Sequence, residues 1–330
     1  MVRHLFSTIS IRNVELPNRI VMPPMATSLA AEDGKVTPQL IKHYTLRAQA
    51  SVGLIIIEHA YVSLQGRVSR RQLGIHSDEV IPGMKELTQS IHSAGGKVCL
   101  QISHGGSICS KDLIKAQPLG PSSIKHPAGR DIPKEMSREE IKGVVSEFCK
   151  AAERAKEAGF DMIEIHGAHG FLLNQFFSPL TNRRSDEYGG SRSSRLRLSI
   201  EIIEGIRSAV DEDFPVLFRL GGDDRMYGGL TVDDAHWAAL RLVRCGVDVI
   251  DLSGGLGGYD GQGQGYFVYL AEAVKPVVDI PVMISGGIRD PHFANSLIEE
   301  GKADLVGIGR ALLEDPQWAE KAKAELAILQ

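Results

Sequence analysis

Short runs of apolar, mostly β-branched residues alternate with longer amphipathic segments along almost the whole chain, and this alternation limits the fold more than any other feature. A strand followed by a helix-like segment, repeated many times, is typical of βα units around a parallel sheet. Eight such units in about 300 residues, with no linker between them, favour a closed (β/α)8 barrel (a TIM barrel) over an open sheet. We therefore predict an α/β protein with a single domain over residues 1–330. The predicted strands cover 18–25, 52–60, 97–104, 161–167, 215–221, 247–254, 281–287 and 304–310.

Two of the predicted helices have clear boundaries. The segment 137–159 opens with Ser137 and Glu140 in the spacing of a capping box and ends at Gly159. The segment 231–246 runs from a capping threonine to Gly246. Helices of this length after strands are what the barrel requires.

Two segments depart from the repeat. Before the first strand, a short alternating stretch with a turn at Arg12–Asn13 predicts an N-terminal hairpin that plugs the barrel floor. Between Gly105 and Met136, about 30 residues rich in Pro, Ser, Gly and Lys separate the third strand from the next helix, and loops of this length are usually functional. The loop follows the carboxyl end of a strand, where barrel enzymes keep their active sites, so we interpret it as a lid. The alternative is a surface insertion without a role.

Composition excludes several classes of function. A formal net charge of −4 over 330 residues gives no broad positive field, which disfavours nucleic acid as a partner. The four cysteines form no C-x-x-C pair, which disfavours a structural zinc site, an iron–sulfur cluster or a disulfide framework. The start of the chain lacks the apolar region of a signal peptide, and no apolar run approaches the ~20 residues that span a bilayer. We expect a cytoplasmic protein that acts on a small molecule, with no membrane partner.

Polar side chains gather at the carboxyl ends of the predicted strands. A purely structural barrel would place apolar residues there, so their shared position predicts one common site. They are Glu58, His59, Gln101, His104, Glu164, His166, Arg219, Asp251 and Ser253.

The last two strands end in glycines that lead directly into helices, in the stretches ISGGIRDP and GIGRALLEDP. Backbone N–H groups in such turns, next to a helix N-terminus, form the anion site that barrels commonly use for a phosphate. Gly286, Gly287 and Gly309, with the charge of Arg310, therefore predict a phosphorylated substrate or cofactor.

Several segments, in order from about Leu5 to Ala324, resemble the old yellow enzyme family of FMN-dependent oxidoreductases. They include VMPPMATSLAAEDGKVTPQLIKHYTLRA, LQISHGGS, LFRLGGDD and, most specifically, HGAHGFLLNQFFSPLTNRRSDEYGGS. The chain is most similar to the short bacterial type, without the iron–sulfur and dinucleotide-binding domains of larger relatives. The resemblance implies an ene-reductase that takes hydride from NADH or NADPH and passes it to an activated C=C bond in two half-reactions, in a homo-oligomer such as a dimer or tetramer.

The resemblance also assigns residues to the flavin. The backbone at Pro24, Met25 and Ala26, together with Ala60, would line FMN, and His166 would lie over it. Gln101 would bond the pyrimidine edge, and Arg219 would stabilise the negative charge of the reduced ring. The phosphate would be held by Gly286, Gly287, Gly309 and Arg310.

The same resemblance assigns the chemistry. His166 and His169 would donate hydrogen bonds to a carbonyl oxygen of the substrate, and the small Gly167 and Ala168 would leave room for it. Phe171 stands at the usual position of a tyrosine proton donor, so the proton would come from water or another group, with Tyr259 or Tyr266 as candidates. A metal site at Glu164, His166 and His169 is the alternative interpretation of these side chains.

Rival functions stay open at this point. An FMN-dependent dehydrogenase could oxidise an amine or a saturated substrate, and a flavin-binding protein could have only adventitious NADH oxidase activity. An aldolase-type barrel would need no flavin. No G-x-G-x-x-G fingerprint follows a strand, so we expect no separate dinucleotide-binding fold.

Overall fold

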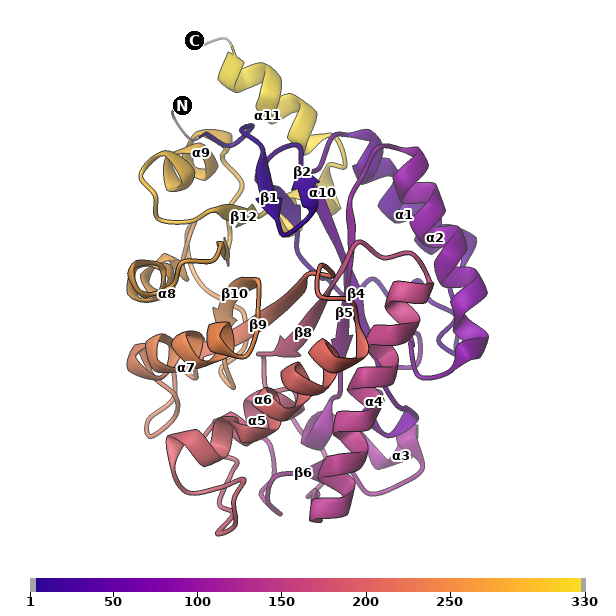
Figure 1. The fold of residues 1–330 in the computed structure, drawn as a ribbon, viewed down its shortest axis with the longest axis vertical. Helices are drawn as coiled ribbons and strands as arrows, with labels where there is room; N and C mark the ends of the chain where they lie inside the picture. The colour runs from indigo at the N-terminus through magenta and orange to yellow at the C-terminus, as the bar shows by residue number, and fades with distance from the viewer. Residues whose placement is uncertain (1–3, 328–330) are drawn as a thin grey trace.

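The computed structural model describes residues 4–327, and its centre is a closed barrel of parallel strands (Figure 1). The predicted (β/α)8 fold is confirmed, and every predicted strand overlaps an observed one. In their order around the barrel the strands are β3 (Ile20–Met22), β4 (Leu54–Tyr61), β5 (Val98–Ser103), β8 (Met162–Gly167), β9 (Val216–Asp223), β10 (Val249–Gly254), β11 (Val282–Ser285) and β12 (Leu305–Gly307).

Three predicted strands end two or three residues earlier than expected, each for a local reason. β3 stops at Met22 because Pro23 and Pro24 have no N–H group for the ladder. β11 stops before Gly286 and Gly287, whose φ angles are +132° and +68°. β12 stops at Gly307, and Arg310, which was predicted to end this strand, is the first residue of a helix.

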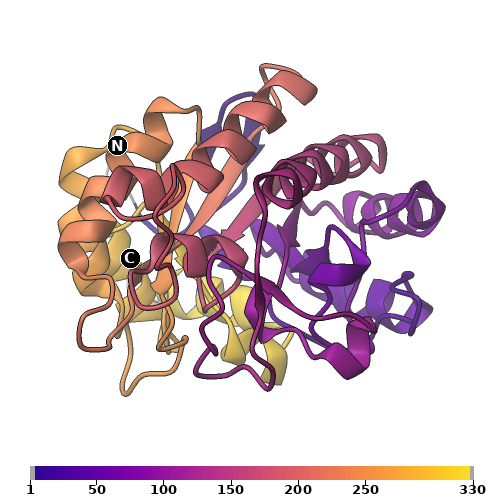
Figure 2. The same ribbon diagram turned by 90° about the horizontal axis from the view of Figure 1, so that it is seen from below.

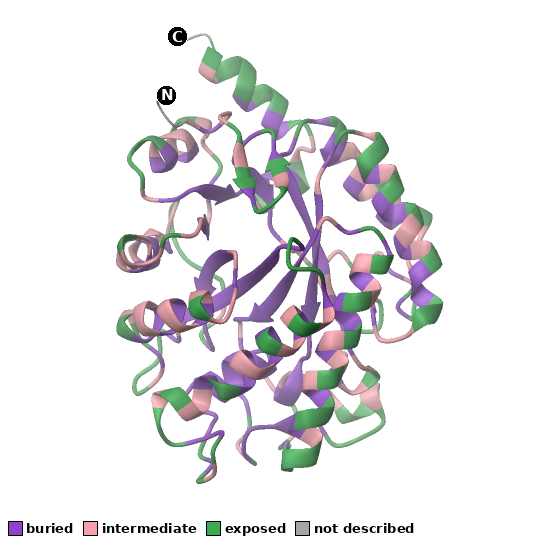
Figure 3. Cartoon of the chain, viewed as in Figure 1, coloured by how far each residue is buried: buried purple, intermediate pink, exposed green. Residues whose placement is uncertain are grey.

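Helices surround the barrel (Figure 2), and their buried faces lie against the strands while their outer faces are exposed (Figure 3). The capping boxes at Ser137–Glu140 and Thr231–Asp234 are both formed. The helices are α1 (Pro38–Gln49), α2 (Ile81–Ser93), α4 (Arg138–Glu157), α5 (Leu172–Phe177), α6 (Arg192–Ala209), α7 (Val232–Arg244), α8 (Val268–Val274), α9 (Pro291–Glu299), α10 (Arg310–Glu314) and α11 (Trp318–Ala327). Within residues 4–327, none of the helices has the length and apolar character needed to cross a bilayer.

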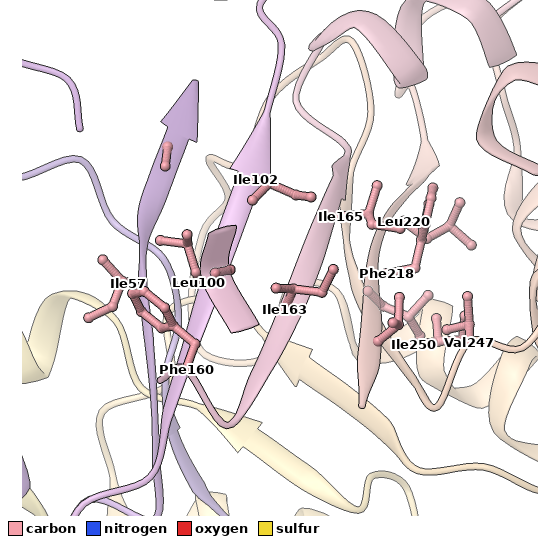
Figure 4. Close-up of a cluster of buried hydrophobic side chains, with 14 of the residues drawn as sticks. Ile57, Leu100, Ile102, Phe160, Ile163, Ile165, Phe218, Leu220, Val247 and Ile250 are labelled. Carbon is pink, nitrogen blue, oxygen red and sulfur yellow. The ribbon is translucent and has the colours of Figure 1, made fainter. Parts of the chain in front are cut away.

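Two separate apolar cores result from the alternation of side chains along the strands. One lies between the strands and the helices and includes Ile57, Ile163 and Phe218 (Figure 4). The other fills the inside of the barrel near the strand starts. The predicted hairpin, β1 (Ile9–Ile11) and β2 (Val14–Leu16), contributes Ile11 and Leu16 to this inner core, so it plugs the barrel floor as expected.

The long segment after β5 lies at the end of the barrel opposite the hairpin (Figure 1). It contains α3 (Lys111–Ile114) and two short paired strands, β6 (Leu119–Gly120) and β7 (Lys134–Glu135). It packs against the segment after β8: the Ser107 N–H donates to Gln175 Oε1, and Arg184 donates to the carbonyl oxygens of Pro121 and Met136. Its action as a lid stays a prediction.

Candidate active site

A cavity of about 580 Å³ lies among the carboxyl ends of the strands. Its wall brings together the polar strand ends and the glycine turns that the sequence singled out. The long segment after β5 contributes Ile108 to the wall. Of the predicted site residues, those that line it are Pro24, Met25, Ala26, Gln101, His166, His169, Phe171, Arg219, Gly286, Gly287, Gly309 and Arg310.

Ala60 was predicted to line the flavin, which stays a prediction; its side chain belongs to the outer core between the strands and the helices. Its neighbour His59 lines the cavity instead. Because successive side chains of a strand point to opposite faces, only one of the two can face the inside. The sequence had identified His59 as a polar strand end without giving it a role.

The chain turns sharply after β8 and brings two imidazole rings together. His169 has a left-handed backbone, with φ of +55°, and its N–H donates to the Gly254 carbonyl over 3.1 Å. The centroids of the His166 and His169 rings lie 5.1 Å apart. His166 Nδ1 accepts from the Ala168 N–H over 3.4 Å, which places the ring proton on Nε2. His169 Nε2 lies 2.7 Å from Ser253 Oγ, so Nδ1 is the nitrogen left for a ligand.

The small residues between the histidines also serve the packing of the barrel. A Cβ atom at Gly167 would lie 2.4 Å from the Phe218 ring, so its size permits packing against β9. Ala168 is fully buried and does not line the cavity. That the two residues leave room for a substrate carbonyl stays a prediction.

Burial keeps the histidines of the cavity neutral. Loss of hydration lowers the pKa of His166 and of His169 well below the usual value near 6.5, and the nearby Arg219 charge lowers both further. Burial also lowers the pKa of His59 to about 4. Near pH 7 these rings are neutral N–H donors.

Below the histidines, the barrel holds a buried carboxyl pair and a buried guanidinium. Gln101 Nε2 donates to Glu164 Oε1 over 2.8 Å, and Arg219 Nε lies 3.3 Å from Asp251 Oδ2 at an angle too poor for a hydrogen bond. Burial raises the pKa of Glu164 well above its usual range, and the neighbouring Asp251 raises it further. Burial likewise raises the pKa of Asp251, against the attraction of Arg219.

Glu58 and Thr27 form a separate pair, because the Thr27 hydroxyl donates to Glu58 Oε1 over 2.8 Å. Thr27 does not line the cavity.

The residues present fit a phosphorylated flavin. Arg219 Nε and Ser285 Oγ line the cavity but have no hydrogen-bond partner within residues 4–327, which is unusual for buried polar atoms and indicates a polar ligand. Two backbone N–H groups just before α9, those of Arg289 and Asp290, already donate to Gln264 Oε1. The phosphate is still expected at Gly286, Gly287, Gly309 and Arg310, which line the cavity. The described part of the chain contains no cluster of three His, Cys, Asp or Glu residues suited to a metal ion.

Two tyrosines border the cavity. The Tyr266 hydroxyl donates to the Tyr259 carbonyl over 2.9 Å and accepts from Arg310 Nη2 over 3.1 Å. The ring of Tyr259 meets His169 edge to face, with centroids 5.3 Å apart, and is 61% exposed. Val68, Ile108, Arg289 and Leu313 also line the wall, and no pattern in the sequence had assigned these four side chains to the site.

The fold and this cavity define a barrel enzyme whose cavity combines glycine turns at helix starts with neutral imidazole donors. Residues 4–328 match the model of the NADH:flavin oxidoreductase / NADH oxidase family. The chain is 41% identical to an NADPH dehydrogenase of Bacillus subtilis over 329 residues, which cover 99% of this chain and 96% of the relative. It is 44% identical to an NADH oxidase of Thermoanaerobacter brockii over 331 residues, 97% of this chain but half the length of that protein. The solved old yellow enzyme homologue from Zymomonas mobilis has a TM-score of 0.88 at 26% identity, covering 98% of this chain and 93% of its own.

The chain therefore belongs to the NADH:flavin oxidoreductase / NADH oxidase family, of the old yellow enzyme type. Membership makes it an FMN-dependent NAD(P)H oxidoreductase.

Proposed function

We propose that this protein reduces activated alkenes such as enones, enals and nitroalkenes at the expense of NADH or NADPH. The observation that carries the proposal is the pair of neutral imidazoles, His166 and His169, whose rings lie 5.1 Å apart in the wall of the cavity. Bound FMN supplies the hydride carrier that both half-reactions share.

The histidines act on the substrate oxygen. His166 donates through Nε2–H, and His169 donates through Nδ1–H when the Ser253 hydroxyl donates to its Nε2. These bonds strengthen as negative charge develops on the oxygen, and one good donor of this kind contributes about 3–4 kcal/mol to the transition state. Because burial keeps both rings neutral, each has one N–H to donate and one unprotonated nitrogen for the contact that fixes the ring.

Other residues hold the flavin and supply the proton. We propose that Gln101 and Arg219 bind its pyrimidine side, that Pro24, Met25 and Ala26 lie along the ring system, and that Gly286, Gly287, Gly309 and Arg310 hold the phosphate. Phe171 has no proton to give. Tyr259 is the better of the two tyrosine candidates for the substrate α-carbon, because the proton of Tyr266 is already directed at a carbonyl.

Anaerobic rapid mixing tests the proposal. The holoprotein is reduced with one equivalent of NADPH and then mixed with 2-cyclohexen-1-one, with a saturated ketone as control. Faster return of the oxidised flavin spectrum with the enone supports the proposal. No return with any activated alkene, together with amine oxidation by an artificial electron acceptor, would assign the protein to the dehydrogenases.

A further inference from the structure

His59 is a cavity residue whose ring is fixed from outside the cavity. Gln72 Nε2 lies 2.9 Å from His59 Nδ1 and donates to the His59 carbonyl over 2.8 Å. Gln72 Oε1 accepts from the Val68 N–H over 2.8 Å. A backbone N–H can only donate, so this third bond shows which end of the amide carries the oxygen. The group that faces His59 Nδ1 is therefore the NH2 end, which can only donate.

The Gln72 contact decides the tautomer of His59. Nδ1 accepts, so the proton of the neutral ring lies on Nε2. No acceptor for this Nε2–H is found within residues 4–327, although His59 lines the cavity. An N–H group in a cavity wall without a protein acceptor is available to a ligand.

His59 thus adds a third imidazole donor to the wall. The centroid of its ring lies 6.5 Å from that of His166, and Phe171 packs against both rings at 5.4 and 4.2 Å. A carbonyl oxygen has two lone pairs, and the proposed function already uses both for His166 and His169. A third donor needs a second acceptor atom.

We propose that His59 is a specificity-determining residue that donates, beside the His166–His169 pair, to the second oxygen of an activating group with two oxygens. The nitro group of a nitroalkene is the smallest example. The inference rests on the proposed alkene reduction and deepens it by naming the substrate class. An enone offers one oxygen and leaves the His59 N–H to water.

A matched pair of substrates tests the inference. 1-Nitrocyclohexene and 2-cyclohexen-1-one share a six-membered ring and differ in the activating group. His59→Leu removes the donor at similar size, and His59→Gln returns an N–H at nearly the same reach. We expect His59→Leu to lower kcat/KM for the nitroalkene about tenfold, as for one lost hydrogen bond, and for the enone less than twofold. His59→Gln should restore most of the nitroalkene rate.

The outcomes separate this inference from the proposed function. Suppose that the parent reduces both substrates. An equal loss of kcat/KM with both in His59→Leu, or no loss with the nitroalkene, would then overturn the role of His59 but not the proposed function. A parent that reduces neither substrate overturns the proposed function and this inference together.

Nitrogen NMR of the holoprotein gives a readout that is independent of activity. The His59 ring should show an unprotonated Nδ1 and a protonated Nε2. Gln72→Glu places an acceptor against Nδ1 and should move the proton there. A parent ring with its proton on Nδ1 would overturn the inference.

Discussion

His169 Nε2 and Ser253 Oγ lie 2.7 Å apart, although the two residues are separated by 84 positions in the chain. The contact joins the turn after β8 to the end of β10, and the backbone N–H of His169 donates to Gly254 beside it. A ring held at one nitrogen presents the other to the cavity. In the proposed function, Ser253 is therefore a positioning residue for His169.

His166→Ala and His169→Ala should keep FMN but weaken the binding of phenols, whose oxyanions resemble the charge that develops on the substrate oxygen. Loss of one donor to an anion should lower the affinity by roughly tenfold or more. Ser253→Ala should give a smaller loss, because His169 stays but its Nδ1–H tautomer is no longer selected. Titration with 4-hydroxybenzaldehyde, followed by its long-wavelength charge-transfer band, measures all three. Unchanged affinity in both histidine variants would remove them from this role.

Arg310→Ala should lower the affinity for FMN roughly tenfold or more while leaving riboflavin binding within about twofold. The guanidinium adds a charge-assisted bond to the phosphate, and riboflavin has no phosphate. Arg219→Ala should weaken both ligands, because the proposed function places this charge at the flavin ring, which both ligands contain. Quenching of flavin fluorescence on binding to the apoprotein measures the dissociation constants of FMN and of riboflavin. A large loss of riboflavin affinity in Arg310→Ala would contradict the phosphate assignment.

Phe171→Tyr should speed alkene reduction only modestly. The added hydroxyl supplies a general acid, which contributes ~10²–10⁴-fold only when the proton moves in the rate-limiting step. The benefit should be largest with nitroalkenes, whose intermediate is stable enough to leave before it is protonated. Rapid-mixing kinetics with enone and nitroalkene make the comparison. Loss of flavin reoxidation by every alkene would show that the phenyl ring, 4.2 Å from that of His166, shapes a different pocket.

His104→Asn should make the stability of the protein less dependent on pH. Burial lowers the folded-state pKa of His104 to about 4, below the unfolded value near 6.5. As the pH falls, the unfolded chain is therefore protonated at a higher pH than the folded protein. The contribution of His104 to the free energy of unfolding is complete above pH 6.5 and is lost as the pH falls toward 4. Within that window the residue contributes a slope of about 1.4 kcal/mol per pH unit.

In the parent, the Gly106 N–H donates to His104 Nδ1 over 3.1 Å. Asparagine offers an acceptor for the same N–H but does not titrate. Urea unfolding at pH 7, 6 and 5 compares the variant with the parent. If the free energy of unfolding changes with pH by the same amount in the variant and the parent, His104 is not neutral in the folded state.

Leu16→Ala should lower the free energy of unfolding by about 2–5 kcal/mol, because Leu16 is fully buried in the inner core below the site. Glu15→Ala, on the exposed side of the same strand, should cost at most about 0.5 kcal/mol. Denaturant unfolding measures the two. If Leu16→Ala lowers the free energy of unfolding as little as Glu15→Ala does, the hairpin does not plug the barrel floor.

The sequence by itself determined the features that depend on near neighbours along the chain. Strand alternation and helix periodicity gave the eight βα units, Arg12–Asn13 gave the hairpin turn, and the run from His166 to Phe171 marked the site. These patterns are readable because each reflects a backbone preference or the burial of one face.

Only the tertiary structure decided which atoms of these elements meet. Gly167 is small because Phe218 lies against it, and Ala60 faces the helices while His59 faces the cavity. The tautomer of His59 depends on Gln72, and the free nitrogen of His169 depends on Ser253. Such pairings follow from the register of the closed barrel, which sets neighbours across strands, and no local pattern along the chain encodes that register.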